Sequence, residues 1–550
     1  MCGILAYHKN TGLKKSDLQL ALSCLNQIKH RGPDGEGVVL IDSKTGNYQL
    51  LKTLDTPKDI ITNLLVENYV ENSADLFFAQ RRLSIIDLSS NGFQPMKDEN
   101  GNWIIFNGEI YNYLEIKTEL ETKGYRFKTN SDTEVILKAY TAYGIDCLSK
   151  FNGMWSIIIW DNQSKKIVIS NDRYGVKPLY YYENRTEWLF ASEIKAYYPL
   201  KEAVKKLNHT SINLFLNAAV LDSGASTFFE DITRFPNAHY QVIDFNSHTK
   251  TTLKYWNHQP VTDYSYTEKR AVDEFNAIIK DAINIRLRAD VECGVALSGG
   301  LDSSVVCYYA QQLLKEKKVA QKLKSFSVIF PNQEGDESYF SKYIAQDLNL
   351  DAKFVNPFEE FSFDDLEKLT YHLDYPLQTT SYYASWSLMR LVSGNKIKVL
   401  LEGQGADELF AGYNHHFYKY GRELILKGKI PLYLSEAKSF SKYKNIPTTL
   451  VHKTVINEVK LFTKLKIGIS KIGFKKEYVN LLDSLDNDFS RDMLPSYLRL
   501  DDRSSMAFGV ESRLPFMDFR LVDFSGRLPS HLKIKDGWQK HIIRKSADIV

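Results

Sequence analysis

The stretch VALSGGLDSSVV (295–306) decides the fold of the second half of the chain. An apolar strand runs into a Ser-Gly-Gly turn, and an Asp-Ser-Ser sequence then opens a helix. Glycines let the backbone approach a ligand closely, and successive N–H groups at a helix start form a nest for phosphate. The chain has no GxxxxGK[ST] sequence, so this is not the usual nucleoside-triphosphatase loop. The stretch predicts a different phosphate loop at the end of a buried strand. A plain Gly-Ser turn before a helix is the alternative.

Strands and helices alternate on both sides of this loop. An amphipathic helix is predicted at 268–289, with further strands at 325–330 (SFSVIF) and 396–403 (KIKVLLEG). Such alternation is typical of a parallel sheet with helices on its faces. Residues 267–550 are therefore predicted to form an α/β domain with helical additions. The purpose of the helical stretch 424–490 stays open, and so does an extension of the natural chain beyond Val550.

The first half of the chain has a different pattern of predicted secondary structure, with short strand-like runs between helical patterns. The helical patterns cover 16–29, 112–123 and 132–149. The strand-like runs are GVVLI (37–41), LFFAQRRLSIIDL (76–88), NWIIFNG (102–108), WSIIIWD (155–161) and IVISND (167–172). Antiparallel strands with a few packed helices predict a layered α+β domain over residues 2–195. Residues 196–266 are predicted to be a connecting region.

Length and composition exclude several classes of protein. A chain of 550 residues is too long for one hydrophobic core, so two large domains are expected. A net charge of +3 without a basic patch predicts no nucleic-acid partner. The five cysteines form no CxxC pair, and the opening MCGILAYHKN is no signal peptide. No apolar run reaches about eighteen residues. We therefore expect a cytoplasmic protein without a membrane span.

The tandem His415-His416 is the one conspicuous histidine pair. Neighbouring side chains on a helix are expected to point apart, and no other ligand cluster stands nearby in the sequence. We therefore expect no dedicated metal site there.

Cys2, directly after the initiator methionine, is a candidate nucleophile. Removing Met1 would leave a cysteine whose own α-amine, with a typical pKa of about 8, can serve as base for the thiol. A cysteine at this position is also often an accident. Nearby segments supply matching chemistry. Arg82 could bind a carboxylate bidentately, and Asn107 with Gly108 could form an oxyanion hole. Asp132 could accept an ammonium group or simply cap a helix.

Together these segments resemble the class II glutamine amidotransferases, whose glutaminase domain has the N-terminal-nucleophile fold, a four-layer αββα sandwich. The resemblance implies that Cys2 attacks the side-chain amide of glutamine and releases ammonia, while Asn107 and Gly108 stabilise the oxyanion. It also implies a set of glutamine-binding residues, in which Arg82 takes the carboxylate and Glu109 and Asp132 hold the ammonium group. The whole set is Arg82, Leu83, Ser84, Ile85, Ile86, Asn107, Gly108, Glu109 and Asp132.

The glycine-rich loop resembles the pyrophosphate loop of the ATP pyrophosphatase superfamily, whose members adenylate a carboxylate or carbonyl. Two carboxylates facing a triphosphate need Mg²⁺ between them, so Asp302 and Asp407 are the predicted metal ligands. Lys540 is the candidate cation for negative charge on the α-phosphate and the departing pyrophosphate. The implied ATP-binding residues are Leu297, Ser298, Gly299, Gly300, Asp302, Ser303, Ser304, Val328, Glu402 and Gly403.

The whole chain resembles the glutamine-hydrolysing asparagine synthetase family. The resemblance implies that ATP adenylates the β-carboxylate of aspartate, and that ammonia reaches this intermediate through a passage closed to solvent and displaces AMP. Glutamine, ATP and the acceptor are the implied partners, with Mg²⁺ as cofactor and a homodimer as the assembly. Intact Cys2 and Asp407 argue against a catalytically silent homologue. A hexosamine-forming amidotransferase would lack the adenylating loop.

One position departs from the family. Many members carry glutamate where this chain has Gln404, and serine where it has Glu402; the usual glutamate is thought to help form the intermediate or to take a proton from ammonia. A neutral amide cannot be a general base. Either water or another carboxylate such as Glu408 takes that role, or the acceptor differs. The alternative acceptor is another carboxylate, such as a uronic acid sugar for surface polysaccharide.

Overall fold

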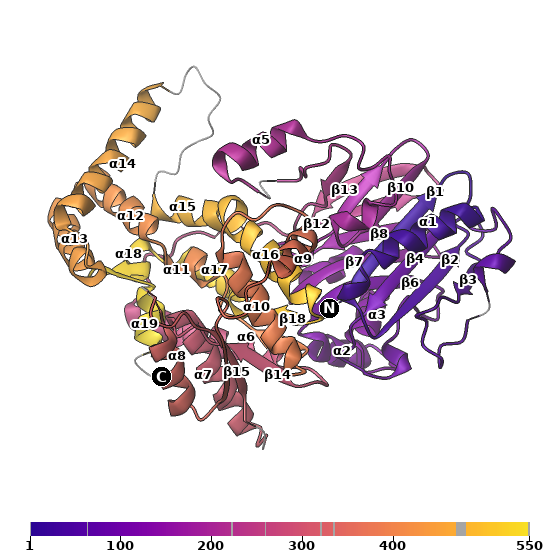
Figure 1. Cartoon of the computed structure of the whole chain (residues 1–550), viewed down its shortest axis with the longest axis horizontal. Helices are drawn as coiled ribbons and strands as arrows, with labels where there is room; N and C mark the ends of the chain where they lie inside the picture. Colours follow the sequence, from indigo (N-terminus) through magenta and orange to yellow (C-terminus); the bar gives the residue numbers. More distant parts are fainter. Residues whose placement is uncertain are drawn as a thin grey trace.

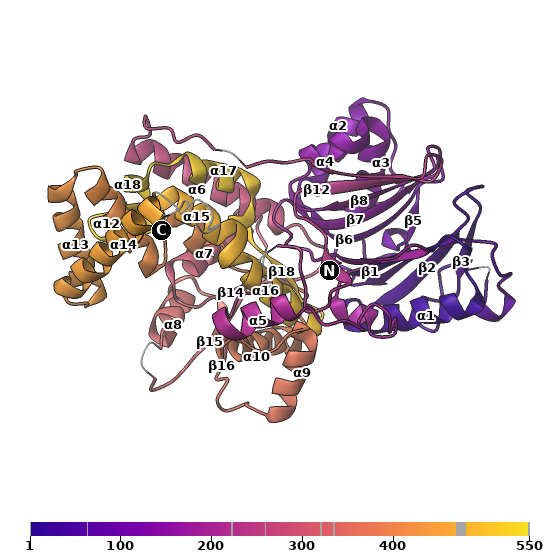
Figure 2. The ribbon, with the colours of Figure 1, turned by 90° about the horizontal axis from the view of Figure 1, so that it is seen from above.

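The computed structural model describes residues 2–547 apart from 63, 222–223, 259, 320–321, 334–335 and 469–479. Figure 1 shows two bodies side by side, with the sheets of the N-terminal half on one side and the helix-rich C-terminal half on the other. The start of the chain lies at the boundary between them in both views (Figures 1 and 2). The predicted two-domain fold is confirmed.

A seven-stranded antiparallel sheet forms the first layer of strands, in the order β11-β9-β10-β1-β4-β2-β3. Alternate residues of its strands serve two cores. Leu5 and Tyr7 pack against the amphipathic helix α1 (Lys15–Asn26), whereas Ile4 and Ala6 face the other sheet. The strands are β1 (Gly3–Lys9), β2 (Gly35–Ile41), β3 (Tyr48–Leu51), β4 (Leu76–Arg82), β9 (Tyr180–Glu183), β10 (Glu187–Ala191) and β11 (Ile232–Arg234).

A second, six-stranded antiparallel sheet packs face to face on the first, in the order β13-β12-β8-β7-β6-β5. Ile105 and Ile158 fill the space between the sheets, and Ile104 and Phe106 face the outer helices. The strands are β5 (Met96–Lys97), β6 (Trp103–Ile110), β7 (Gly153–Asp161), β8 (Lys166–Asn171), β12 (His239–Asp244) and β13 (Thr249–Lys254); the helices are α2 (Tyr113–Thr122), α3 (Asp132–Tyr143) and α4 (Cys147–Lys150). Figure 2 shows these four layers on edge, which confirms the αββα sandwich.

The predicted connecting region 196–266 is in part sheet. Three of its segments, β11, β12 and β13, extend the two sheets, while helix α5 (His209–Ala218) stays outside them. Strand β13 was not predicted because it is an exposed edge strand. Its sequence, TKTTLK, has no alternation of apolar and polar residues. The polar run at 244–250 is the turn of the β12–β13 hairpin.

The C-terminal half is built on a five-stranded sheet in the order β16-β15-β14-β17-β18, and every pair in it is parallel. This confirms the α/β prediction. Strands β14 (Cys293–Ala296) and β17 (Val399–Leu401) are neighbours, so the loops at their carboxyl ends lie side by side. The other strands are β15 (Lys324–Val328), β16 (Asp351–Val355) and β18 (Glu511–Arg513).

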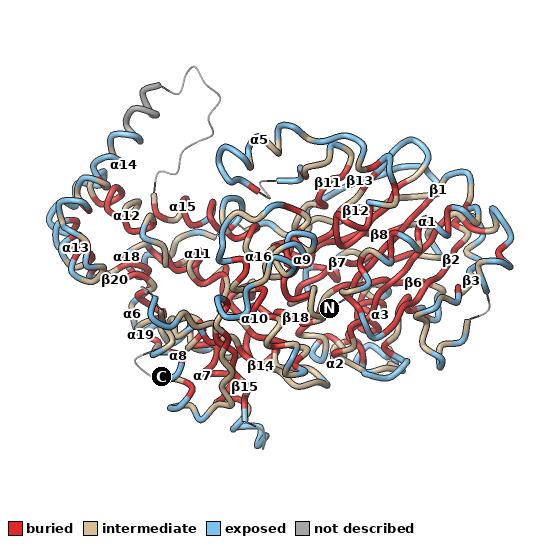
Figure 3. Tube along the Cα trace, viewed as in Figure 1, coloured by how far each residue is buried: buried red, intermediate tan, exposed pale blue. Residues whose placement is uncertain are grey.

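Helices cover this sheet and continue beyond it, as Figure 1 shows. The helices are α6 (Glu268–Arg286), α7 (Leu301–Glu316), α8 (Ser338–Asp347), α9 (Phe363–Leu373), α10 (Ser381–Gly394), α11 (Ala406–Phe410), α12 (Asn414–Leu426), α13 (Ile430–Lys444), α14 (Thr448–Gly468), α15 (Leu481–Asn487), α16 (Leu494–Ala507), α17 (Phe519–Arg527), α18 (Ser530–Lys533) and α19 (His541–Ala547). In Figure 3 the sheet strands are largely buried, whereas α13 and α14 are largely exposed on their outer sides.

The helical stretch 424–490 shares a small core with the first turns of α12. Phe417 and Phe440 stack with ring centroids 3.8 Å apart, and Val451, Val455 and Leu481 surround them. One helix of the stretch also touches the hairpin of β19 (Ile534–Lys535) and β20 (Trp538–Gln539). The stretch therefore buttresses the hairpin that precedes Lys540, although part of it lies outside the described residues.

Buried ion pairs join the two halves of the chain. Arg31, in the first half, bonds Asp502 of α16 through both terminal nitrogens, at 2.8 and 2.9 Å. One of these nitrogens also donates to Glu193 at 2.6 Å. A second link runs through Asp518, which accepts from Asn152 of the first half and from Arg286, each at 2.9 Å. All of these side chains are buried, so the contact between the halves excludes water.

Replacing Asp502 with asparagine is expected to lower the free energy of unfolding by about 3–5 kcal/mol, because it leaves the buried Arg31 guanidinium without its full partner. Urea denaturation followed by circular dichroism measures the change. Asp347→Asn, at an exposed carboxylate near the end of α8, is the matched control. Equal denaturation midpoints for the Asp502 variant and the control would contradict the role of this ion pair.

Candidate functional site

Cys2 lies just before β1, beside the end of β6. Its main-chain N–H donates to Asn107 Oδ1 at 3.1 Å, and its carbonyl accepts from Arg31 Nε at 3.0 Å. The thiol lies 4.0 Å from the Leu83 carbonyl oxygen. Burial raises the pKa of the Cys2 thiol, so a base is needed to form the thiolate.

A hydrogen-bond donor without a partner stands next to this cysteine. Asn107 is fully buried, and its Nδ2 has no hydrogen-bond partner among the described residues. A buried N–H donor without a protein partner is rare, and an oxygen atom of a bound ligand would accept its hydrogen bond. Gly108, the next residue, has φ +152°, and a Cβ there would lie 2.0 Å from the Met154 carbonyl oxygen. Only glycine therefore fits at this position.

Arg82 ends β4 close enough for its charge to act on the Cys2 thiol. Its terminal nitrogens donate to the Ser89 and Asp87 carbonyl oxygens at 2.9 and 2.5 Å. Both bonds end on neutral groups, so they orient the guanidinium without neutralising it. The segment after Arg82 is fixed from both sides, because Ser84 N–H donates to Asp34 and the Ile85 carbonyl accepts from Asp290 N–H.

Two carboxylates close the other side of this region. Burial raises the pKa of Asp132 to about 6, and its Oδ2 accepts from Ile110 N–H at 3.0 Å. Glu109 lies 3.3 Å from Arg513, its Oε2 has no partner among the described residues, and burial raises its pKa well above the ordinary value. The simple helix-cap interpretation of Asp132 is wrong, because Ser131 is the N-cap of α3.

A cavity of about 440 Å³ opens at the carboxyl ends of β14, β15 and β17. Apolar side chains such as Phe326 and Leu388 form part of its wall. Most of the predicted ATP-binding residues line it, together with Gln404, and both predicted metal ligands are among the lining residues. They are Leu297, Ser298, Gly300, Asp302, Ser303, Val328, Glu402, Gly403, Gln404 and Asp407.

Two predicted residues of this loop face elsewhere. Gly299 has φ +89°, and a Cβ there would meet the backbone of α8 at 2.8 Å. Ser304 turns its hydroxyl back to the Gly300 carbonyl at 2.6 Å, within the start of α7. Both shape the loop and do not line the cavity.

Lys540 brings the two phosphate-side loops together. Its Nζ lies 2.5 Å from Asp302 Oδ2 and 2.7 Å from Asp407 Oδ1. A Cβ on Gly412 would lie 1.7 Å from Asp407 Oδ1, so this approach requires a glycine. Asp302 Oδ1 is buried and has no hydrogen-bond partner among the described residues. Two carboxylates around one ammonium keep a net negative charge, and their oxygens are ligands of the kind that Mg²⁺ prefers. The residues therefore fit a Mg²⁺ ion.

The sequence analysis missed the residues that hold Lys540, Asp302 and Asp407 in place. Glu436 of α13 accepts from the N–H groups of Asp536 and Gly537, at 3.0 and 2.7 Å, and so fixes the hairpin turn before Lys540. No local pattern reveals a contact that spans a hundred residues. Tyr413 and Tyr497 also line the cavity. Tyr413 ends the stretch EGQGADELFAGY (402–413), which also carries Gln404 and Asp407, so its place near these residues could have been predicted.

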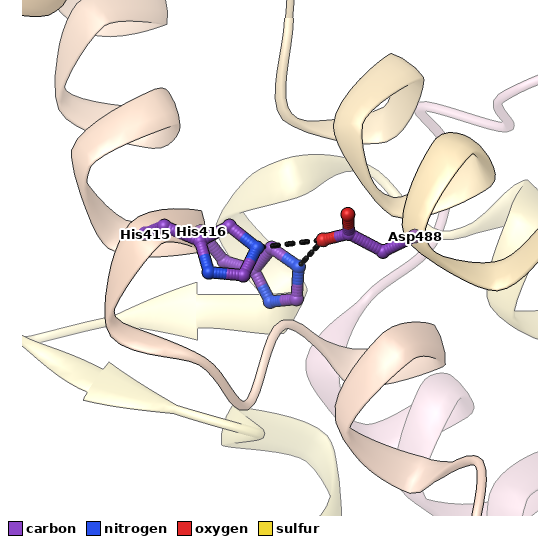
Figure 4. A group of neighbouring side chains, drawn as sticks. All are labelled: His415, His416 and Asp488. Carbon is purple, nitrogen blue, oxygen red and sulfur yellow. Dashed lines mark hydrogen bonds and ion pairs between the residues drawn. The ribbon is translucent and has the colours of Figure 1, made fainter. Parts of the chain in front are cut away.

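The two histidines of the tandem converge, contrary to expectation (Figure 4). His415 Nε2 and His416 Nε2 lie 2.6 and 2.8 Å from Asp488 Oδ2, because both residues stand in the first turn of α12 facing the π-helical turn that carries Asp488. His416 Nδ1 accepts from Tyr413 N–H, so its Nε2 carries the proton and has no lone pair for a metal. Burial alone would raise the pKa of Asp488, but the two histidine bonds lower it to about 2. The contacts favour a hydrogen-bonded cluster.

Fold and sites together define a glutamine amidotransferase joined to a synthetase domain. The chain matches the family model described as a glutamine amidotransferase domain over residues 67–256 and the model described as asparagine synthase over residues 274–549. The chain therefore belongs to the asparagine synthase family. Within the described part of the chain, no helix has both the length and the apolar character needed to cross a membrane.

Several named proteins are similar over most of their length. Asparagine synthetase [glutamine-hydrolyzing] 1 of Bacillus subtilis is 29% identical, over 100% of this chain and 84% of its own. Putative asparagine synthetase [glutamine-hydrolyzing] 2 of Methanocaldococcus jannaschii is 31% identical, over 78% of each chain. Amidase chry2 of Gibberella zeae is 26% identical, over 99% of this chain and 86% of its own.

Asp302→Asn is expected to weaken the Mg²⁺-dependent binding of a non-hydrolysable ATP analogue by about tenfold or more, because hydrogen bonds and ion contacts of a charged group are worth about 1.5–3 kcal/mol. Isothermal titration calorimetry with and without Mg²⁺ measures this difference. Asp347→Asn again serves as the control with the same chemical change. An unchanged Mg²⁺ dependence would remove Asp302 from the predicted metal ligands.

Proposed function

We propose that this chain is a glutamine-dependent, ATP-dependent amide synthetase that forms asparagine. One observation supports the proposal that the two sites work together: Arg513 contacts residues of both. Its guanidinium lies 3.3 Å from Glu109 in the cysteine site, and its carbonyl accepts from Glu402 N–H beside the nucleotide cavity at 3.0 Å. This shared contact supports the proposal that nitrogen released at Cys2 passes to the cavity through the interior of the protein.

In the first site, Cys2 attacks the glutamine side-chain amide after Met1 is removed, with its own amine as base. The unpartnered Asn107 Nδ2 and the Gly108 backbone then stabilise the oxyanion. Arg82 binds the substrate carboxylate, and Glu109 with Asp132 holds its ammonium group. Leu83, Ser84, Ile85 and Ile86 contribute backbone to the wall. Ammonia leaves, and water releases glutamate from the cysteine.

In the second site, the cavity binds ATP and the acceptor carboxylate attacks the α-phosphate, with pyrophosphate as leaving group. Lys540 stabilises the negative charge that develops there. Asp302 and Asp407 would hold a Mg²⁺ ion, which when bound neutralises phosphate charge. Ammonia then attacks the acyl-adenylate, and AMP departs as the amide forms. We also propose a homodimer and a glutaminase domain that extends through the β12–β13 hairpin.

Aspartate is the first candidate acceptor because the similar proteins are asparagine synthetases by name. A second candidate has support from the cavity itself. Aspartate carries a further carboxylate that needs a cation, yet the described lining residues include no arginine or lysine, and Lys540 beside them is already paired with Asp302 and Asp407. Tyr413, Tyr497 and Gln404 offer neutral hydrogen-bonding groups instead. These suit a hydroxyl-rich acceptor with one carboxylate, such as a uronic acid sugar.

Cys2→Ala is expected to abolish glutamine hydrolysis and to leave amide synthesis from ammonium chloride within about twofold of wild type, because the variant removes only the nucleophile. Glutamate release and amide formation are measured side by side. Cys293→Ala, at a second partly exposed cysteine, is the matched control. Glutamine hydrolysis at the wild-type rate in the Cys2 variant would exclude this cysteine as the nucleophile.

Acceptor identity is decided by product analysis. Purified enzyme with ATP, Mg²⁺ and glutamine is given aspartate or a uronic acid sugar, and pyrophosphate, AMP and the amide are quantified. Aspartate is expected to give equal amounts of AMP and asparagine. Product from the sugar acid alone would replace aspartate by the second candidate, and no AMP with any carboxylate would overturn the proposed function.

A further inference from the structure

Four carboxylates line the nucleotide cavity among the described residues: Asp302, Glu337, Glu402 and Asp407. Asp302 and Asp407 are committed to Lys540. Glu337 is exposed at the start of α8. Glu402 has a buried oxygen without a hydrogen-bond partner among the described residues and a second carboxyl group beside it, and it forms no ion pair with a lysine or arginine of the described part of the chain.

Glu402 is held rigidly. It directly follows β17, and its N–H donates to the Arg513 carbonyl on β18 at 3.0 Å. Its carboxyl group lies beside the Asp501 carboxyl group of α16 and the Ser512 hydroxyl of β18, and its buried Oε1 has no hydrogen-bond partner among the described residues. A carboxyl–carboxyl bond requires a proton between the two groups. The pair therefore presents one free acceptor oxygen next to the cavity.

The pair also stands on the side of the cavity that faces the cysteine site. Glu402 N–H donates to the carbonyl of Arg513, whose guanidinium lies 3.3 Å from Glu109 in the cysteine site. Asp501 directly precedes Asp502, which bonds Arg31. Glu402 is therefore the cavity-lining carboxylate whose backbone is bonded to a residue that also contacts the cysteine site.

We propose that Glu402 is the proton acceptor for the attacking nitrogen, with Asp501 as its positioning partner; this rests on the proposed function. As ammonia attacks, the C–N bond forms and the carbonyl electron pair moves to oxygen. An N–H proton passes to Glu402 Oε1 while the shared proton shifts to Asp501. The carbonyl then re-forms, the C–O bond to AMP breaks, and its electron pair leaves on the phosphate oxygen. The pair returns its extra proton to water after product release.

Charge and burial support this assignment. Burial raises the pKa of Glu402 well above the ordinary value, the Asp501 carboxylate adds to the rise, and burial also raises the pKa of Asp501. A proton shared between two adjacent carboxyl groups leaves one negative charge on the pair, and that charge can accept a further proton. Gln404 offers no basic oxygen.

Glu408, the other candidate base, faces a different space. It lines a neighbouring cavity of about 350 Å³ that also contains Lys533 and Asp486. The Tyr413 hydroxyl donates to its Oε1 at 2.8 Å from the nucleotide side. Glu408 therefore lies behind a tyrosine, whereas Glu402 lines the nucleotide cavity directly.

The test separates adenylation from amide formation. Wild type, Glu402→Gln, Glu402→Asp and Asp501→Asn are assayed for acceptor-dependent ATP–pyrophosphate exchange and for amide formation from ammonium chloride. Glu367→Gln, at an exposed glutamate on α9, is the control. Hydroxylamine is the second nucleophile, because it is already unprotonated near neutral pH and its product forms with less need of a base.

Glu402→Gln is expected to lose amide formation by about a hundredfold or more, the ordinary contribution of a general base, and to lose far less of the exchange, because glutamine keeps the shape with which this residue lines the cavity. Hydroxamate formation should fall by less than amide formation in both Glu402→Gln and Asp501→Asn, and Glu402→Asp should recover part of the loss. Normal exchange with amide formation within threefold of wild type in Glu402→Gln would overturn the inference. So would an equal loss with both nucleophiles. Absence of exchange in the wild type would overturn the proposed function itself, and the inference with it.

Discussion

The buried ion pair between Arg31 and Asp502 is the constraint on which the rest of the structure depends. A buried guanidinium that loses its partner is left with an uncompensated charge, so the two halves of the chain cannot slide past each other without a large cost in free energy. The same guanidinium donates to the Cys2 carbonyl. On α16, Asp502 neighbours Asp501, and Asp501 bonds Glu402 at the nucleotide cavity. Two adjacent residues of one helix therefore tie the position of the thiol to that of the cavity wall.

Strand β18 adds a second tie of the same kind. Arg513 bonds Glu511 at 2.6 Å, contacts Glu109 of the first half, and accepts Glu402 N–H through its carbonyl. Both side chains of this strand are fully buried. Charged groups placed so deeply are retained only where geometry and hydrogen bonds compensate them, and they resist motion. Orphaned groups stand at both ends of this arrangement, at Asn107 Nδ2 and at Asp302 Oδ1. These two unpartnered atoms stand where the proposed ligands would bind.

Sequence predicted those parts of the molecule whose chemistry is local. The loop after β14 was found because glycines, a buried strand and a helix start stand together within twelve residues, and the two domains followed from strand and helix alternation. Contacts between distant segments were out of reach. Strand β13 has no apolar face, Glu436 stabilises a turn a hundred residues away, and Asp488 meets His415 and His416 across a long helical excursion. Gly299 and Ser304 belong to the right loop, but their orientation depends on α8 and on the first turn of α7.

The loop after β17 shows why residue position alone is a weak guide to chemical role. Glu402 and Gln404 are two residues apart, and both line the same cavity. Only Glu402 is tied by its backbone to β18 and by its side chain to α16. A basic oxygen is useful when it is held at a fixed distance from the reacting nitrogen and when its partner can take up a shared proton. Those conditions are set by the neighbouring strand and helix, so a carboxylate placed at either position can serve the cavity if that support is present.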